Sequence, residues 1–169
     1  MIVTERLKIR NFVESDCEVL VSMLQDSVFM AYSEAGALAT DRAVARYREI
    51  LEYSKSGLGK KALILKDTNQ IIGYCGIEPF ELDGKRELEL GYRLIASYRG
   101  HGHGYATEAA RAVISAFAGP KLFAYVESEN TKSLNVLVKL GFEELGLRQI
   151  KEKSYLLFLR AENCRGLGG

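Results

Sequence analysis

The chain has 169 residues, of which 47% are hydrophobic and 27% charged, and this is the composition of one ordinary globular domain. Its formal net charge of +1 gives no electrostatic reason to expect a nucleic acid or an anionic membrane as a partner. No apolar run approaches the ~20 residues that cross a bilayer, and charged residues within the first six argue against a signal peptide.

The cysteines bear on the cellular compartment. Cys17, Cys75 and Cys164 are odd in number and lack the spacing of metal ligands, so we expect free thiols in a reducing environment. Cys75 lies in an apolar segment and is expected to fill the core. A cytoplasmic protein is the expectation.

The first third of the chain predicts one strand and two helices. Residues 7–10 alternate apolar and charged side chains, which is typical of a half-exposed strand. Asp16 is suited to cap a helix whose apolar face is formed by Val19, Leu20, Met23 and Leu24. Residues 28–40 predict a loop or a short irregular helix, and residues 41–56 predict a second helix.

Strands dominate the middle of the chain. Strands are predicted over residues 62–65, 71–77 and 87–95, with turn-forming residues at 67–70 between the first two. Asp83-Gly84, a strong hairpin signal, separates the second from the third.

The last third predicts alternating helices and strands. The helices cover residues 105–117 and 130–140, and the strands cover residues 122–126, 142–149 and 155–159. Antiparallel strands followed by strand–helix units indicate an α/β (α+β) fold, with a mixed, mostly antiparallel sheet and helices on both faces. We expect a single domain over residues 1–162 and a flexible tail over 163–169.

The most informative segment precedes the third predicted helix. Three glycines alternate in Arg99-Gly100-His101-Gly102-His103-Gly104, and a helix-forming sequence follows at once. Such a loop brings backbone amides to a helix N-terminus, where they bind phosphate. Tyr105 stands where the dinucleotide-binding fingerprint needs its third glycine, and no Gly-Lys-Ser/Thr sequence occurs, so both of those nucleotide-binding classes are excluded.

Four ordered segments resemble the GNAT N-acetyltransferase superfamily, in its ribosomal-protein alanine/serine N-acetyltransferase-like branch. The glycine loop and the following Tyr105-Ala106-Thr107-Glu108-Ala109 are similar to the family's acyl-CoA loop. The other three segments are Thr4-Glu5-Arg6-Leu7-Lys8-Ile9-Arg10, Glu89-Leu90-Gly91-Tyr92, and the stretch from Asn130-Thr131-Lys132-Ser133 to Lys139-Leu140-Gly141-Phe142.

The resemblance implies a binding site for acetyl-CoA, used as a co-substrate without a metal. The strands at 87–95 and 122–126 would splay into a V, with the pantetheine arm pairing to backbone at Leu94 and Ile95. The pyrophosphate would lie on amides of the glycine loop, which comprises Arg99, Gly100, His101, Gly102, His103, Gly104, Tyr105 and Ala106.

His101 and His103 are the two histidines of the chain. Two histidines two residues apart, without a third ligand, make a poor zinc site. They either are solvated loop residues or supply partial positive charge to the phosphates. In the second case acetyl-CoA binding weakens as the pH rises from about 6 to about 8.

The segment at Asn130 is expected to serve the thiol end of the cofactor. Asn130 fits a helix N-cap, and the resemblance adds a side-chain bond to the pantetheine. Ser133 would lie near the thiol and help to reprotonate it. Leu137 stands where many family members carry a tyrosine general acid, and Tyr125 and Tyr155 are possible substitutes.

Glu89 is the expected general base, acting through water, because a carboxylate in an apolar strand requires a partner or a water-filled cleft. The alternative is an ion pair with Arg86 or Arg93. Glu78 is a reserve for the base, and Glu34 is better suited to binding a cationic acceptor.

The sequence therefore predicts an acetyl-CoA-dependent N-acetyltransferase in which a primary amine attacks the thioester directly. The amine is either a protein N-terminus or a small molecule, and neither nucleic acid nor membrane is expected as a partner. The oligomeric state and the length of the acyl group stay open. The alternative is a CoA-binding sensor or decayed enzyme without catalysis, and a ribosome-surface binder is a third possibility.

Overall fold

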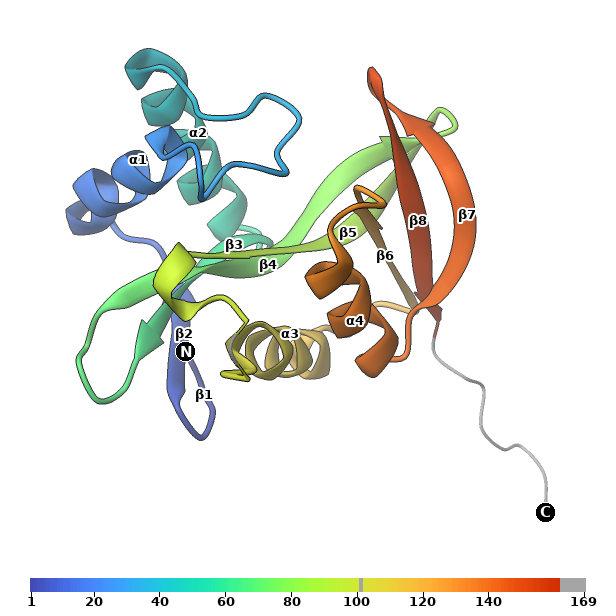
Figure 1. Cartoon of the computed structure of the whole chain (residues 1–169). Helices are drawn as coiled ribbons and strands as arrows, with labels where there is room; N and C mark the ends of the chain where they lie inside the picture. Colours follow the sequence, from blue (N-terminus) through green and yellow to red (C-terminus); the bar gives the residue numbers. More distant parts are fainter. Residues whose placement is uncertain (101, 162–169) are drawn as a thin grey trace.

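A computed structural model describes residues 1–100 and 102–161, which form one eight-stranded sheet with helices on both faces (Figure 1). The strand order is β1-β2-β3-β4-β5-β6-β8-β7. The strands are β1 (Ile2–Val3), β2 (Leu7–Asn11), β3 (Gly59–Leu65), β4 (Ile71–Leu82), β5 (Lys85–Leu94), β6 (Lys121–Val126), β7 (Glu143–Ile150) and β8 (Lys153–Ala161).

Four α-helices cover the sheet. They are α1 (Cys17–Gln25), α2 (Thr40–Ser54), α3 (Tyr105–Ala116) and α4 (Thr131–Lys139), and short 3₁₀ helices lie at Glu14–Asp16 (η1) and Ala96–Tyr98 (η2). Helices α1 and α2 lie on one face of the sheet, and α3 and α4 lie on the other (Figure 1). Within the described residues, no helix has the length and apolar character needed to cross a membrane.

The sheet is antiparallel except between β5 and β6, which confirms the predicted mixed fold. These two strands run parallel and share one registered pair, Glu89 with Phe123. Beyond that pair they diverge, while β6 continues its antiparallel pairing with β8. The expected V therefore opens at Glu89.

Two tight turns set the register of the long central strands. Asp83 and Gly84 both have positive φ values, 51° and 74°, which is the backbone that the Asp-Gly pair predicts between β4 and β5. Asn69, with φ of 58°, turns the chain between β3 and β4.

The N-terminal region differs from the prediction in three details. Strand β1 was not predicted, because two residues carry no periodic signal. Asp16 does not cap α1 with its side chain; its carboxylate accepts from the Val13 N–H at 2.9 Å and pairs with Arg10 at 2.6 Å. Val19 is exposed, while the other three residues of the predicted face are buried.

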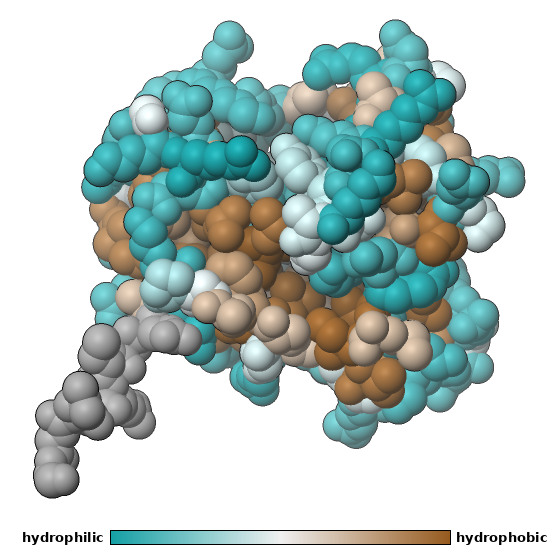
Figure 2. Space-filling model, turned by 180° about the vertical axis from the view of Figure 1, so that it is seen from behind, coloured by the Kyte–Doolittle hydropathy of each residue, from teal (hydrophilic) through white to brown (hydrophobic). Residues whose placement is uncertain are grey.

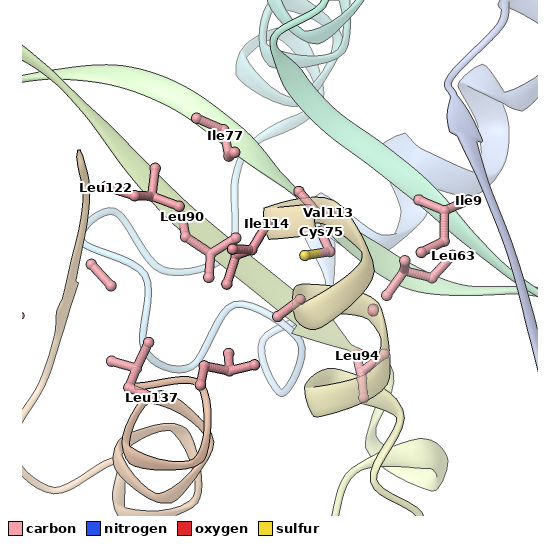
Figure 3. Close-up of a cluster of buried hydrophobic side chains, with 14 of the residues drawn as sticks. Ile9, Leu63, Cys75, Ile77, Leu90, Leu94, Val113, Ile114, Leu122 and Leu137 are labelled. Atoms are coloured by element: carbon pink, nitrogen blue, oxygen red, sulfur yellow. The ribbon is translucent and has the colours of Figure 1, made fainter. Parts of the chain in front are cut away.

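Each face of the sheet has its own hydrophobic core. The core under α3 and α4 includes Cys75 on β4, Val113 on α3 and Leu137 on α4 (Figure 3). The second core, under α1 and α2, contains Phe29, Ile50 and other buried apolar residues. Seen from behind, hydrophobic residues also form a band across the surface, bordered by hydrophilic side chains (Figure 2).

The predictions about Cys164 and about a flexible tail at 163–169 concern residues outside those that the structure describes. Cys17 and Cys75 are free thiols in the structure. Burial raises the pKa of the Cys75 thiol to about 12, so this thiol is an inert part of the core, as its apolar segment predicted.

Candidate active site

A large open cavity, about 1310 Å³ in volume, lies where β5 and β6 separate. The glycine loop and the start of α4 line one side of it. The loop between α1 and α2, together with parts of α2, β4 and β8, lines the other side. Most of the expected cofactor and acceptor residues thus border a single space, but Ile95 and His103 are not among its lining residues.

The glycine loop has the backbone that its sequence predicts. Gly100, Gly102 and Gly104 all have positive φ values, of 60°, 73° and 70°, and Gly104 is the N-cap residue of α3. The first amides of α3 have no acceptor within the helix and remain available to a ligand. His101 lies outside the described residues, and the His103 ring stacks on the Tyr105 ring with 5.6 Å between centroids.

Lys132 is a cofactor-side residue to which the sequence analysis gave no role. A Cβ built at Gly100 would lie 2.8 Å from Lys132 Nζ, so the first turn of α4 brings an ammonium group against the glycine loop. Lysine is a common point charge for phosphate binding. The signal was present in the Asn130-Thr131-Lys132-Ser133 segment, but only the fold shows that α4 reaches back to this loop.

Arg99 joins the two sides of the cavity through backbone carbonyls. Its Nε donates to the Leu94 carbonyl at 2.7 Å, and its Nη2 donates to the carbonyls of Val28 and Phe29 at 2.8 and 3.1 Å. The guanidinium therefore fixes the end of β5 and the loop between α1 and α2 to each other.

The end of β5 presents one backbone N–H to the V. Ile95 donates its N–H to the Ile72 carbonyl on β4 at 2.9 Å and accepts from the Tyr98 N–H, so both of its polar backbone groups are used inside the chain. Because N–H groups of successive strand residues point to opposite sides, the Leu94 N–H is directed away from β4, toward the gap. Of the two expected pantetheine partners, Leu94 is the one with a free backbone donor on that side.

Glu89 stands at the vertex of the V, but neither expected arginine pairs with it. Its Oε1 lies 3.1 Å from Nζ of Lys60, a buried lysine on β3. The same ammonium group lies 3.4 Å from Oε2 of Glu78, and Arg46 of α2 reaches that oxygen at 2.6 Å. The partner was hidden from sequence reasoning because Lys60 is 29 residues away from Glu89, on a strand two positions across the sheet.

This charge cluster lies in the interior and depends on mutual compensation. Burial lowers the pKa of Lys60, but the charges of Glu89 and Glu78 outweigh that effect and raise it. Burial likewise favours a higher pKa for Glu78. The charges of Lys60 and Arg46 outweigh that effect, so the pKa of Glu78 is lowered. Oε1 of Glu78 is buried without a hydrogen-bond partner among the described residues.

The start of α4 brings together three polar groups. Asn130 is the N-cap, as predicted, and its Oδ1 accepts from the Ser133 N–H at 3.3 Å. The Ser133 hydroxyl lies 2.9 Å from the Tyr92 hydroxyl, which the sequence analysis did not single out. Leu137 is fully buried and packs in the core under α3 and α4 (Figure 3), and its hydrocarbon side chain has no proton to donate.

The acceptor side carries aromatic rings and an ion pair between Glu34 and Lys151. Glu34 Oε2 lies 3.1 Å from Lys151 Nζ, which links the loop between α1 and α2 to the turn between β7 and β8. Phe80 contacts Tyr125 with 5.3 Å between ring centroids, and Tyr125 contacts Tyr155 at 5.1 Å. These rings come from β4, β6 and β8, and they give the acceptor side of the cavity an aromatic lining.

Comparisons with known proteins agree with this geometry. The acetyltransferase (GNAT) domain family matches residues 6–143 of the chain. The chain is similar to the uncharacterised N-acetyltransferase p20 of Bacillus licheniformis, with 32% identity over 158 residues that cover 89% of this chain and 86% of the relative.

Two solved structures share the fold. An acetyltransferase from Agrobacterium tumefaciens C58 superimposes with a TM-score of 0.79 at 25% identity, over 95% of this chain and 93% of that one. RimL, a ribosomal L7/L12 α-N-protein acetyltransferase in complex with coenzyme A, superimposes with a TM-score of 0.73 at 15% identity, over 94% and 96% of the two chains.

Proposed function

Because this chain belongs to the GNAT acetyltransferase family, we propose that it transfers the acetyl group of acetyl-CoA to a primary amine by direct attack in a ternary complex. One observation carries the proposal. The strands β5 and β6 separate at Glu89, and this carboxylate then stands between an amide-rich glycine loop and a separate acceptor side of the same cavity.

The residues on the cofactor side fit a pyrophosphate and a pantetheine arm. Positive φ values at Gly102 and Gly104 turn the loop into the N-terminus of α3, where amides and the helix dipole favour an anion. Lys132 adds a full positive charge beside Gly100. The Asn130 side-chain amide is a donor for a carbonyl group of the arm.

Glu89 removes the proton from the attacking amine through a bridging water. Its exposed fraction is small, and the ion pair with Lys60 keeps the carboxylate oriented. The Leu94 N–H donates to the thioester oxygen as negative charge develops there, which is the kind of preorganised donor that lowers an acyl-transfer barrier. Ser133 donates a hydrogen bond to the departing sulfur.

The acceptor is a protein N-terminus or a small-molecule amine. Glu34 at the mouth and the rings of Phe80, Tyr125 and Tyr155 offer a carboxylate and aromatic faces, both of which bind a cationic group. RimL acts on a protein N-terminus and shares the fold, which supports an amine acceptor in this chain without naming it.

The proposal is tested first by calorimetric titration with acetyl-CoA. Gly102→Glu should abolish binding, because a carboxylate would stand where the pyrophosphate lies. Gly84→Glu is the matched control, since both glycines have φ near 73° and open space around a built Cβ, but Gly84 lies in the β4–β5 turn. If the native chain fails to bind acetyl-CoA, or if both variants bind equally, the proposed site is wrong.

Turnover separates an enzyme from a sensor. Release of the CoA thiol should depend on an added amine, in a panel of N-terminal peptides and small primary amines. Binding without turnover across the whole panel would instead favour the non-catalytic alternative. Running the titration at pH 6 and pH 8 also tests the two histidines, whose contribution to phosphate binding should be larger at the lower pH.

A further inference from the structure

Strand β5 presents different chemistry on its two faces. Gly91 lies beside Lys60, and Arg93 reaches toward the Phe29 carbonyl, so Glu89, Gly91 and Arg93 face α1 and α2. Leu90 and Leu94 belong to the core under α3 and α4. Tyr92 is three residues from Glu89, so its side chain lies on the opposite face of β5. There it extends toward the start of α4.

The Tyr92 hydroxyl contacts two atoms of Ser133. It lies 2.9 Å from Ser133 Oγ and 3.2 Å from the Ser133 carbonyl oxygen. A phenol has one proton, so only one of these atoms can accept it at a time. When Tyr92 donates to the carbonyl, Ser133 donates its own proton to Tyr92; when Tyr92 donates to Oγ, the Ser133 proton is free to point into the cavity.

The surroundings keep this phenol a hydrogen-bond donor. Burial raises the pKa of Tyr92, and the hydrogen bond with Ser133 only partly opposes that effect. Tyr92 therefore stays protonated at neutral pH. The backbone of Tyr92 is held in the sheet, where Tyr92 lies opposite Cys75 of β4.

From this geometry we infer that Tyr92 is a positioning residue that orients the Ser133 hydroxyl toward the sulfur of CoA. The inference rests on the proposed acetyl transfer. It assigns to a residue of β5 part of the task that a side chain at Leu137 cannot perform.

The reaction balances without any proton transfer through Tyr92. The amine nitrogen forms a bond to the acetyl carbon, the carbon–sulfur bond breaks, and the electron pair leaves with the sulfur as a thiolate. The amine proton passes through water to Glu89. Ser133 donates a hydrogen bond to the thiolate, and Tyr92 turns its proton from the Ser133 carbonyl to Oγ, which strengthens that donor.

The first test measures the pKa of the CoA thiol bound to the protein, from thiolate absorbance in the ultraviolet as a function of pH. A free thiol has a pKa of about 8.5, and a hydrogen-bond donor to the thiolate lowers that pKa. The native protein should lower it by about one pH unit, and Tyr92→Phe and Ser133→Ala should each return it toward the value of free CoA.

Tyr47→Phe is the matched control. Tyr47 is also buried, and its hydroxyl donates to a backbone carbonyl, that of Glu14, at 3.2 Å, but it lies in the other core, outside the cavity. This variant removes the same hydroxyl chemistry and should leave both the thiol pKa and turnover unchanged. A thiol pKa that moves equally in the two tyrosine variants would overturn the inference.

Kinetics supply the second test. Tyr92→Phe should lower kcat about tenfold with little change in KM for acetyl-CoA, because the hydrogen bond strengthens only as charge develops on sulfur. Added to Ser133→Ala, it should cause no further loss, since Tyr92 acts through that hydroxyl. Additive losses would show instead that Tyr92 acts independently of Ser133.

The outcomes separate this inference from the proposed function. If the native protein binds no CoA, the proposed function fails and the inference fails with it. If the native protein binds CoA and lowers its thiol pKa, but Tyr92→Phe does the same, only the inference is overturned.

Discussion

At the scale of single residues, Lys60 shows how much the site depends on buried charge. Its ammonium group is almost fully buried between two carboxylates, and such a group is tolerated only because Glu78 and Glu89 compensate it. The raised pKa of Lys60 means that this stabilisation is complete below the ordinary lysine value of 10.5 and is lost only as the pH rises above it.

Replacing Lys60 with methionine should therefore destabilise the fold by about 3–5 kcal/mol at neutral pH, because Glu89 is left in the interior without its cation and Glu78 keeps only Arg46. The loss should shrink toward pH 4, where the carboxylates of the variant become protonated. Urea unfolding at the two pH values measures both effects. Lys61→Met, at the next position of β3, is the control and should cost less than about 1 kcal/mol.

Glu89 offers a direct test of base catalysis. Glu89→Gln should lower kcat most at low pH, where the acceptor amine is largely protonated and its deprotonation is hardest. A pH–rate profile measures this. Glu87→Gln is the control, because Glu87 lies on the same face of β5, pairs with Lys121 at 2.6 Å and stays outside the cavity lining. Equal profiles for both variants would remove Glu89 from the mechanism.

At the scale of elements, Arg99 couples two segments that the sequence separates by 70 residues. Arg99→Gln removes the donors that hold the Val28 and Phe29 carbonyls, so the loop between α1 and α2 should open more often. We expect amide exchange over residues 28–33 to become faster and KM for the amine to rise about tenfold.

Arg148→Gln serves as the comparison for that loop. Arg148 also donates to backbone carbonyls, those of Leu145 and Leu147, but it lies on β7 away from the cavity. This variant should leave exchange in the loop unchanged. The proposed coupling is contradicted if the two variants perturb the loop alike.

The elements themselves were largely predictable from the sequence, because their signals are local. The Asp83-Gly84 turn, the glycine loop before α3 and the N-cap at Asn130 each specify their own backbone. The contacts that assemble the site are not local. Lys60 with Glu89 and Tyr92 with Ser133 join strands and helices whose relative positions follow from the whole topology, and no periodicity in a single segment carries that information.

At the scale of the whole molecule, the Arg6–Glu108 ion pair and the hydrogen bonds around it connect the N-terminal strands to α3. Glu108 in the first turn of α3 accepts from the Thr4 hydroxyl at 2.6 Å, from the Arg6 N–H at 2.9 Å and from Arg6 Nε at 2.7 Å. Burial favours a higher pKa for Glu108. These hydrogen bonds outweigh that effect, so the pKa of Glu108 is lowered. Its stabilisation is thus present above the ordinary glutamate value of 4.5 and lost as the pH falls below it.

Glu108→Gln should lower the free energy of unfolding by about 1 kcal/mol at pH 7 and leave it nearly unchanged at pH 3. Urea titrations across this range measure the difference. Glu5→Gln is the control. It changes an exposed carboxylate between Thr4 and Arg6 and should have little effect on the free energy of unfolding at either pH. An equal loss at pH 7 and pH 3 would show that the charge of Glu108 is not what holds this contact.

The single registered pair between β5 and β6 has a consequence for cooperativity. The sheet consists of a five-stranded part, β1 to β5, and a three-stranded part, β6, β8 and β7, which share only the Glu89–Phe123 pair as a strand register. A pantetheine arm lying between β5 and β6 would form hydrogen bonds with both parts of the sheet, at positions where the two strands do not pair with each other. Acetyl-CoA would then act as a fold-completing segment, and amide protons of β6 and β8 should become as slow to exchange as those of β4 only when it is bound.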